Sequence, residues 1–416
     1  MKRYIPVLFI VALFVSACAD GAGDGTTVPE EPADTTAPPS EEASTTEGSE
    51  TGEGPTGDPV IFGAPIALSG GFELYDGEMI EGMEFAIEEV NAEGGILGRP
   101  VELIIVDHQT DVAQVEAATL EVLEQGADVI VPTVDYDFGA AAALVAADEG
   151  VVSISGAGAP EFGYEGLGDF HFNVYQGTPT EGAVMAEWAF ATQQWDQAFL
   201  LVDTSIEYST SQCEFFTEVF TGLGGEIVGE ETFLNSDPSI TSQVSSAAAS
   251  DADVVILCSY PPGGASAVRQ LRTGGVELPI FAGAAFDGTF WLEAIPDLSD
   301  FYYPGMVSSA GDDPNPAANE FLAQTEPAGA SIYALFGHLI VETIREGAER
   351  AGTLEGQALA DAIETFDGFE TLVGPTTYSE TCHLPVGRPM AIIEIQGGEP
   401  SFIEYVTPQL TPDAPC

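Results

Sequence analysis

Four cysteines in the body of the chain could carry covalent chemistry: Cys213, Cys258, Cys382 and Cys416. Their spacing lacks the Cys-x-x-Cys arrangement of zinc and redox sites, so disulfide formation is the chemistry that the sequence favours. Four cysteines allow three pairings. We favour Cys213–Cys258 and Cys382–Cys416, because each pair then lies within one group of structural segments. Disulfides in turn indicate an oxidising compartment.

The other residue types that support catalysis form no recognisable constellation. His108, His171, His338 and His383 are scattered and lack the spacing of metal ligands. The chain contains no Gly-x-Ser-x-Gly elbow, no His-Glu-x-x-His motif and no phosphate-binding loop. Carboxylates are abundant, but no pair is singled out by its position. The sequence therefore indicates a protein that is not an enzyme and that uses no metal or cofactor.

Residues 1–18 carry the features of a secretory signal. Two basic residues at positions 2 and 3 precede an apolar run over 5–15, which is shorter than the roughly 20 residues of a permanent membrane span. The last residue of the run begins the sequence Val15-Ser16-Ala17-Cys18, which resembles a bacterial lipobox. We therefore expect Cys18 to be lipidated and to anchor the mature chain to the cell membrane. An ordinary signal peptide cleaved near Ala17 is the alternative.

The segment 19–58 has the composition of a tether. It contains Thr, Ser, Pro, Gly, Glu and Asp and almost no large apolar side chain. Such a segment cannot bury enough apolar surface to offset the entropy of ordering, so we expect it to be disordered. Repulsion among its carboxylates extends it, which would hold the globular body away from the membrane.

The chain as a whole is strongly acidic. It has 68 aspartates and glutamates against 8 lysines and arginines, and its one lysine is Lys2. A body of this charge repels phosphates, which excludes nucleic acid as a partner. Because salt screens repulsion between surface charges, the composition suggests an acidic proteome adapted to high salt.

Apolar runs and apolar residues at helical spacing predict alternating strands and helices in the body after residue 58. The predicted strands are 60–68, 101–106, 128–132, 151–155, 198–202, 226–233, 254–257 and 279–282, and the predicted helices are 77–91, 112–125, 139–149, 181–193, 211–223, 240–249 and 264–273. Two such series predict an α/β protein with two doubly wound parallel-sheet lobes. Ligands of these folds sit at the carboxyl ends of the strands, so two facing lobes would enclose a cleft.

Several segments carry a family resemblance. Residues 63–70 read Gly-Ala-Pro-Ile-Ala-Leu-Ser-Gly, and 82–98 follow the pattern G-x-x-x-A-x-x-x-x-N-x-x-G-G-I-x-G. Residues 106–110, 157–161 and Gly374-Pro375 extend the similarity. Taken together and in this order along the chain, these segments resemble the branched-chain amino acid (leucine/isoleucine/valine) binding proteins. These are the type I periplasmic solute-binding proteins of ABC transporters. The resemblance covers the body from about residue 59 onward.

The resemblance implies an arrangement of lobes that periodicity does not show. The chain would cross between the lobes three times, and the crossings would form a hinge. Lobe one would hold 59–176 and 311–388, and lobe two 177–310 and 389–416. We expect a monomer that captures an amino acid or similar small molecule by closure and delivers it to an ABC transporter permease. A ligand-sensing clamp for a separate receptor is the alternative.

The positions that match the family's ligand contacts lie at strand ends and on one helix. They are Ser69, Tyr75, Asp135, Tyr136, Ala157, Gly158, Tyr208, Tyr260, Asp287 and Tyr333. In the family, backbone N–H groups of the loop matched by 156–158 hold a ligand carboxylate, and aromatic residues wall the cleft. Each position also has an ordinary structural interpretation, such as a half-buried tyrosine, a turn at Asp287 or a helix cap at Asp135.

Two departures from the family's pattern bear on the ligand. Gly158 lacks the hydroxyl that usually helps to hold the carboxylate, and Asp135 stands where the family often has a serine. Two like charges repel strongly in a poorly solvated cleft. A cationic or neutral ligand, such as an amine, an amide or a polyol, is therefore compatible with the sequence alongside an amino acid.

Overall fold

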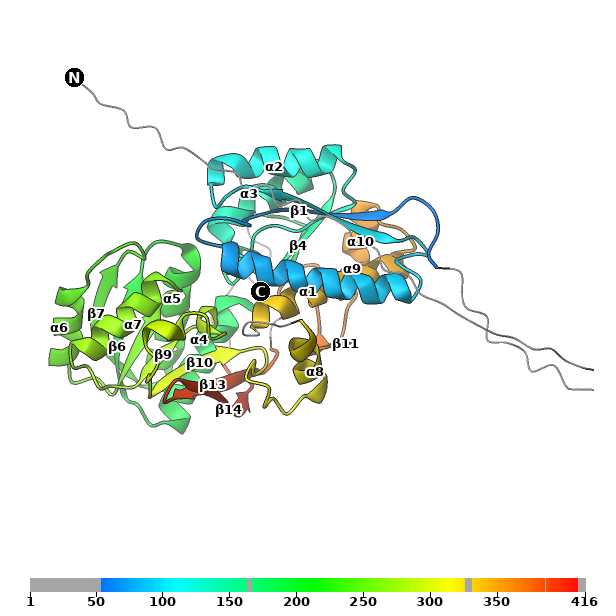
Figure 1. The fold of residues 1–416 in the computed structure, drawn as a ribbon. Helices are drawn as coiled ribbons and strands as arrows, with labels where there is room; N and C mark the ends of the chain where they lie inside the picture. Colours follow the sequence, from blue (N-terminus) through cyan, green and yellow to red (C-terminus); the bar gives the residue numbers. More distant parts are fainter. Residues whose placement is uncertain (1–53, 163–166, 326–330, 386, 411–416) are drawn as a thin grey trace, which may run out of the picture. The chain divides into compact units, whose positions relative to one another are not determined.

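The computed structural model describes residues 54–162, 167–325, 331–385 and 387–410 (Figure 1). The expected signal peptide with Cys18, most of the expected tether and Cys416 lie outside the described residues. Among the helices that the structure does describe, none has both the length and the apolar character needed to cross a membrane.

The first sheet contains five parallel strands in the order β2-β1-β3-β4-β5. Its strands are β1 (Val60–Ile66), β2 (Val101–Asp107), β3 (Val129–Ile130), β4 (Val152–Ser155) and β5 (His171–Asn173), connected by α1 (Glu73–Ala92), α2 (Val112–Glu124), α3 (Tyr136–Asp148) and the short 3-10 helix η1 (Pro160–Phe162). The strands and helices predicted for this region are confirmed, although β3 is reduced to two residues. Strand β5 is too short to be predicted from an apolar run.

The second sheet has seven strands in the order β14-β13-β10-β9-β8-β6-β7. Its strands are β6 (Gln197–Asp203), β7 (Glu226–Phe233), β8 (Val254–Cys258), β9 (Ile280–Ala282), β10 (Phe301–Gly305), β13 (Met390–Gln396) and β14 (Glu399–Val406). Strands β6 to β10 pair in parallel, which confirms the prediction for β6 to β9, whereas β10 was not among the predicted strands. Strand β13 pairs antiparallel with both β10 and β14, so the predicted parallel sheet also carries an antiparallel edge.

The turn between β13 and β14 explains the antiparallel edge. Gly397 and Gly398 form a two-residue connection with φ of 61° and 82°. Both values lie in the left-handed region, which two-residue hairpin turns require and which glycine adopts without steric cost.

The helices around the second sheet follow the predicted alternation. They are α4 (Gly177–Glu187), α5 (Glu207–Leu223), α6 (Thr241–Ala249) and α7 (Gly263–Thr273), with short turns η2 (Trp188–Thr192), η3 (Ala284–Phe286) and η4 (Leu292–Ala294). The helix predicted over 181–193 is α4 followed by the π-helical turn η2.

The chain leaves the second sheet after β10 and forms α8 (Pro316–Gln324), α9 (Ile332–Ala351), α10 (Gly356–Ile363) and the hairpin of β11 (Phe369–Thr371) and β12 (Gly374–Thr376). Helix α9 packs along α1, and both α9 and α10 contact β4 of the first sheet (Figure 1). Strand β13 then joins the second sheet. The lobe limits at 176, 310 and 388, which the family resemblance implies, remain a prediction.

Helices α1 and α9 cross with their backbones in contact. A Cβ added to Gly82 would collide with the carbonyl oxygen of Ala334, and one added to Gly337 would collide with the carbonyl oxygen of Met79. Glycine at both positions therefore permits the close approach of the two helices. The crossing fixes the first turns of α1 and α9 relative to each other.

One predicted disulfide is confirmed. Cys213 of α5 is bonded to Cys258, the last residue of β8, across 45 residues of sequence. The predicted Cys382–Cys416 pair includes a residue outside the described part of the chain.

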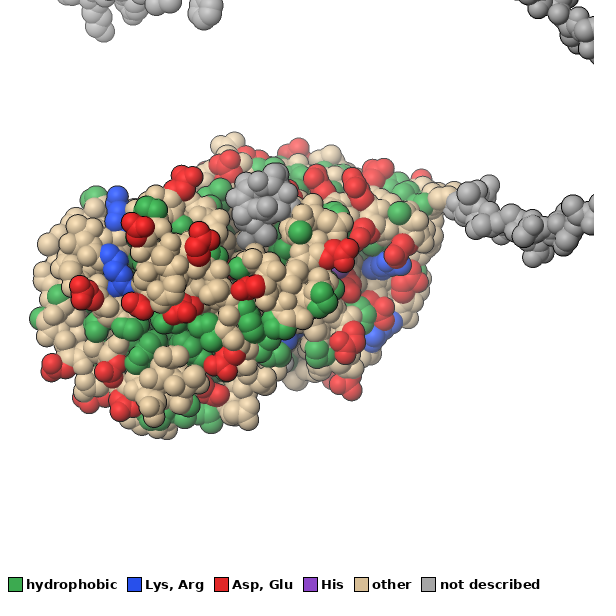
Figure 2. All heavy atoms as spheres, turned by 60° about the horizontal axis from the view of Figure 1, so that its bottom comes forward, with side chains coloured by type: hydrophobic (Ala, Val, Ile, Leu, Met, Phe, Trp, Pro, Cys, Tyr) green, Lys and Arg blue, Asp and Glu red, His purple; other side chains and the backbone are tan. Residues whose placement is uncertain are grey.

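The acidic composition is visible on the surface. Figure 2 shows aspartate and glutamate side chains spread over one face of the molecule, with basic side chains in a few small groups. The negative charge is therefore dispersed over this face rather than gathered into one patch.

Candidate ligand-binding site

A cavity lies between the two sheets. Its walls follow the carboxyl ends of β1, β3, β4 and β5 on one side and of β6, β8 and β9 on the other. The lining residues are Phe72, Tyr75, Val134, Asp135, Gly156, Gly158, Tyr175, Ile206, Tyr208, Tyr260, Ala284, Ala285, Ile332, Tyr333 and Phe336. This is the position at which doubly wound sheets bind ligands.

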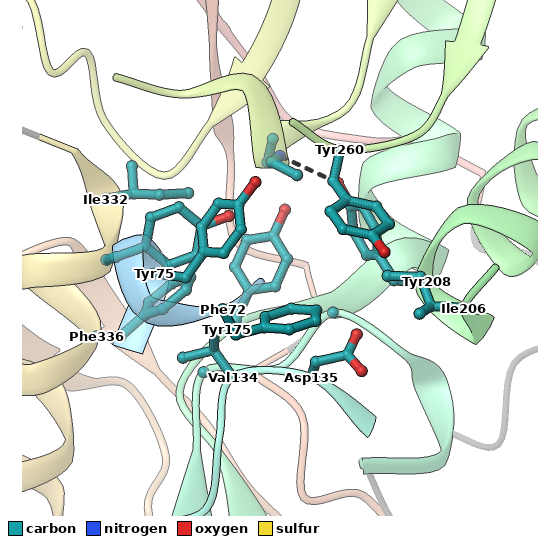
Figure 3. Close-up of a pocket in the computed structure, with 15 residues that line it drawn as sticks. Phe72, Tyr75, Val134, Asp135, Tyr175, Ile206, Tyr208, Tyr260, Ile332 and Phe336 are labelled. Carbon is teal, nitrogen blue, oxygen red and sulfur yellow. Dashed lines mark hydrogen bonds between the residues drawn. The ribbon is translucent and has the colours of Figure 1, made fainter. Parts of the chain in front are cut away.

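The first wall is aromatic and comes from the starts of α1 and α9 (Figure 3). The ring centroids of Phe72 and Tyr75 lie 5.6 Å apart, those of Tyr75 and Tyr333 4.9 Å, and those of Tyr333 and Phe336 5.3 Å. These separations fall in the range of favourable aromatic pairs. The four rings therefore form one continuous surface.

The second wall carries Tyr208, in the first turn of α5, and Tyr260, which follows β8. The ring of Tyr260 stacks on Phe72 of the first wall, with centroids 5.8 Å apart and planes inclined by 25°. The backbone N–H of Ala285 donates to the Tyr208 hydroxyl at 3.2 Å, drawn as a dashed line in Figure 3. The two walls thus meet through stacked rings.

A buried glutamate orients two of the tyrosines. The hydroxyl of Tyr175 donates to Glu181 Oε2 at 2.6 Å, and that of Tyr208 donates to Oε1 at 2.9 Å. The Ala284 N–H donates to the same Oε1 at 2.9 Å, and the Gln212 side-chain amide also donates to it. Burial raises the pKa of Glu181, and these hydrogen bonds oppose the rise. The two phenol groups are consequently directed toward the carboxylate of Glu181.

Asp135 is the one acidic side chain in the lining. It is 3% exposed, and its Oδ1 atom has no hydrogen-bond partner among the described residues. Burial raises its pKa to about 8, with a further contribution from the charge of Asp137. Figure 3 shows Asp135 below the rings, with a carboxyl oxygen turned toward them. A buried carboxyl oxygen without a partner is costly, so this atom is suited to meet a donor on a ligand.

The loop after β4 is already engaged with the protein itself. The Ala157 N–H donates to Ser155 Oγ at 3.1 Å, and the Asn173 side-chain amide donates to the Ala157 carbonyl at 2.6 Å. A Cβ on Gly156 would collide with the ring of Phe336, and one on Gly158 with the ring of Tyr208. The rings therefore pack directly on the loop that the resemblance assigns to a ligand carboxylate.

Six of the ten predicted site residues line the cavity: Tyr75, Asp135, Gly158, Tyr208, Tyr260 and Tyr333. The other four lie outside the lining. The Ser69 hydroxyl donates to Asp107 Oδ2 at 2.8 Å, and Tyr136 packs against the buried Ala143 and Leu167. Ala157 lies in the loop between two lining glycines. None of these placements tests a contact with a ligand.

Asp287 lies behind the cavity wall. Its Oδ2 atom accepts the N–H of Ile332 at 2.6 Å, and its Oδ1 atom accepts the hydroxyl of Ser309 at 2.7 Å. Burial raises its pKa to about 6. Asp287 therefore holds the start of α9 through hydrogen bonds within the protein.

Several lining residues are absent from the predicted set, including Phe72, Tyr175, Ile206 and Phe336. Phe336 lies three residues after Tyr333 on α9, and this spacing places both on one helix face. This helical spacing could have identified Phe336 as a site residue from the sequence. Within the described residues, no group of three or more His, Cys, Asp or Glu side chains is arranged to hold a metal ion.

The model of one protein family matches most of the chain. It is described as periplasmic binding protein, and the match covers residues 59–399. The chain belongs to the periplasmic binding protein family. Its members are substrate-binding proteins, and the two sheets with a cavity at their strand ends are in keeping with this membership.

Relatives within the family are named for branched-chain amino acids. The Leu/Ile/Val-binding protein BraC3 of Rhizobium johnstonii is 25% identical over 328 residues, covering 77% of this chain and 88% of that protein. A leucine-, isoleucine-, valine-, threonine- and alanine-binding protein of Pseudomonas aeruginosa is 24% identical, covering 75% of this chain and 84% of that protein.

Solved structures show the same fold with different ligands. The branched-chain amino acid binding protein LivJ of Streptococcus pneumoniae, in complex with isoleucine, aligns with a TM-score of 0.75 at 21% identity, covering 84% of this chain and all of that one (100%). A solute-binding protein of R. palustris in complex with benzoate aligns with a TM-score of 0.73 at 18% identity, covering 86% and 98%. The fold is thus that of type I periplasmic binding proteins, and it accommodates chemically different ligands.

Proposed function

We propose that this protein is the extracytoplasmic solute-binding component of an ABC importer. It captures a small molecule, such as an amino acid, an amine or an amide, in the cavity between the two sheets. The observation that carries the proposal is the cavity itself, which is lined by residues from both sheets. Family membership and the names of the relatives support it.

Capture proceeds by closure. The ligand enters an open form, the lobes rotate about the three crossings, and the rings of both walls cover it. A ligand shifts the balance between open and closed forms only by its difference in affinity for the two. The closed form then presents both lobes to the permease together, and the transporter supplies the energy for import.

The lipid anchor is part of the proposal and depends on sequence features. The protein is a monomeric lipoprotein held at the membrane outside the cytoplasm, and Val15–Cys18 with the acidic tether that follows supports the lipid anchor. Globomycin, which inhibits lipoprotein signal peptidase, provides a test in cells that express the chain. Globomycin is expected to cause a longer precursor of the wild-type chain to accumulate, and a Cys18→Ser variant, whose processing should not change with globomycin, is the control. Equal processing of both chains would contradict lipidation at Cys18.

A thermal-shift screen of the full-length chain in mild detergent and high salt tests solute binding. The panel contains amino acids, amines, amides, polyols and small carboxylates. A ligand that binds only the folded state raises the melting temperature by mass action. We expect at least one class of compound to raise it. A folded protein with a flat response across the whole panel would contradict the proposed function.

A further inference from the structure

We propose that the cavity binds a small organic ammonium ion, held by the faces of its aromatic rings and by the carboxyl group of Asp135. This inference rests on the proposed function, because it names the chemical class of the captured solute. It departs from the zwitterionic amino acids after which the relatives are named.

The first support is the density of aromatic rings. Seven of the fifteen lining residues are aromatic: Phe72, Tyr75, Tyr175, Tyr208, Tyr260, Tyr333 and Phe336. The face of an aromatic ring carries negative potential and attracts an ammonium group within about 6 Å of its centre. A cavity walled by rings on both sides therefore favours a cation over a neutral molecule of the same shape.

Three of the five phenol hydroxyls of the cavity donate to groups of the protein itself. Tyr75 donates to the Pro261 carbonyl at 2.8 Å, and Tyr175 and Tyr208 donate to Glu181. A hydroxyl has one proton to donate. These three tyrosines consequently offer a ligand their ring faces and not a donor for an anion.

The second support is the set of ionisable side chains among the lining residues. Asp135 is buried, lies on the cavity and has an oxygen without a partner among the described residues. No arginine, lysine or histidine is among the lining residues. A protonated amine would supply the missing donor, and the positive charge of any ammonium group, quaternary ones included, would favour the ionised carboxyl. A ligand carboxylate would instead find no basic side chain among the lining residues to offset its charge.

Helix dipoles do not reverse this preference. Helices α1, α3, α5 and α9 begin at the cavity, and their positive ends would favour an anion by about 0.3–1 kcal/mol each. Each end already has an acidic partner: Glu73, Asp137 and Glu207 lie in the first turns of α1, α3 and α5, and Asp287 accepts the first N–H of α9. The loop at 156–158, as described above, is covered by rings.

Calorimetric titration of the ligand-free full-length chain tests the inference with probes that share a shape and differ in charge. Choline is compared with its neutral analogue 3,3-dimethylbutan-1-ol. The cation 3-methylbutylamine is compared with leucine and with the anion 4-methylpentanoate. We expect each cation to bind at least about tenfold more tightly than its partners. Tightest binding of leucine or 4-methylpentanoate would overturn the inference and leave the proposed function standing. Binding of no probe would also overturn it, whereas the broader thermal-shift panel decides the proposed function.

Variants identify the groups responsible. Asp135→Asn is expected to weaken choline binding by about tenfold or more and to leave 3,3-dimethylbutan-1-ol unchanged. Tyr260→Leu is expected to weaken choline about fivefold, whereas Tyr260→Phe, which keeps the ring face, stays within about twofold. Asp148→Asn, at the exposed far end of α3, is the control for loss of one carboxylate. Folded Asp135→Asn protein that binds choline as tightly as the wild type would overturn the role of Asp135.

Discussion

The hydroxyl of Tyr75 donates a buried hydrogen bond of 2.8 Å to the carbonyl oxygen of Pro261. Tyr75 belongs to α1, beside the first sheet, and Pro261 belongs to the loop after β8 of the second sheet. The bond therefore joins the two walls of the cavity. Its formation stabilises the arrangement in which the walls are together.

Removing this bond should favour separation of the walls. Tyr75→Phe leaves the Pro261 carbonyl without its donor, which costs the closed form about 1–3 kcal/mol. We expect ligand affinity to fall by about fivefold or more and the ligand-free radius of gyration, measured by small-angle X-ray scattering, to increase. Tyr302→Phe is the matched control, because Tyr302 bonds to Glu394 within the second sheet. Equal scattering and equal affinity for Tyr75→Phe and wild type would contradict a role in closure.

Stability should depend on pH through Asp135. Burial raises its pKa from 3.8 to about 8 in the folded protein, with the charges of Asp137 and Asp76 adding to the rise and two backbone hydrogen bonds opposing it. The folded state thus keeps a proton that the unfolded chain releases, so this contribution to stability is full below about pH 4 and is lost as the pH rises toward 8. The ionisable groups Tyr75 and Tyr260 also face this carboxyl.

Asp135→Asn removes this titration. We expect the free energy of unfolding of the variant, relative to wild type, to rise by about 1.4 kcal/mol per pH unit from about pH 5 to about pH 7. Urea unfolding of the ligand-free proteins at several pH values measures the difference, and groups that titrate equally in both proteins cancel. Asp148→Asn serves as the control for an exposed aspartate. A difference that does not change with pH would show that Asp135 is not held protonated.

Two glycines of one helix should respond in opposite directions to alanine. Gly82→Ala forces a Cβ against the Ala334 carbonyl, and we expect it to destabilise the fold by about 1–3 kcal/mol. Gly77 lies on the same helix with nothing within 4 Å of an added Cβ. Gly77→Ala should therefore be neutral or stabilising by up to about 1 kcal/mol. Melting temperatures of the two variants distinguish a close helix crossing from a loose one, in which both changes would be tolerated.

The disulfide between α5 and β8 should contribute both stability and geometry. It closes 45 residues, for which the chain-entropy model gives about 4 kcal/mol. The double variant Cys213→Ala, Cys258→Ala should lose a stability of this order in urea unfolding. Because Tyr208 and Tyr260 lie near its two ends in sequence, ligand affinity should also fall. Unchanged unfolding of the double variant would mean that native contacts alone hold α5 to β8.

The sequence predicted those parts of the fold that depend on local periodicity. The β–α alternation up to β9 follows from apolar spacing, which packing against a sheet enforces. The direction of β13 and β14 is set by the Gly397-Gly398 turn and by pairing with β10, a partner about 90 residues away. Such long-range pairing leaves no local pattern in the sequence.

Site residues that follow predicted strands could be identified from the sequence. Site residues whose role depends on which side chains are buried together could not. Tyr208 and Tyr260 follow predicted strands, and both line the cavity. Tyr175 follows the three-residue β5, and Glu181 lies on a helix that is buried throughout. A glutamate on such a helix has no sequence signal that reveals its tyrosine partners.

The crossing of α1 and α9 also bears on the entropy of binding. Because backbones hold these helices together, Phe72, Tyr75, Tyr333 and Phe336 reach the cavity as a preformed surface. A ligand that meets this surface avoids most of the cost of immobilising flexible side chains, about 0.5–1.5 kcal/mol for each. Selectivity can then change through single ring substitutions on this wall, while the motion that brings the other wall to the ligand stays the same.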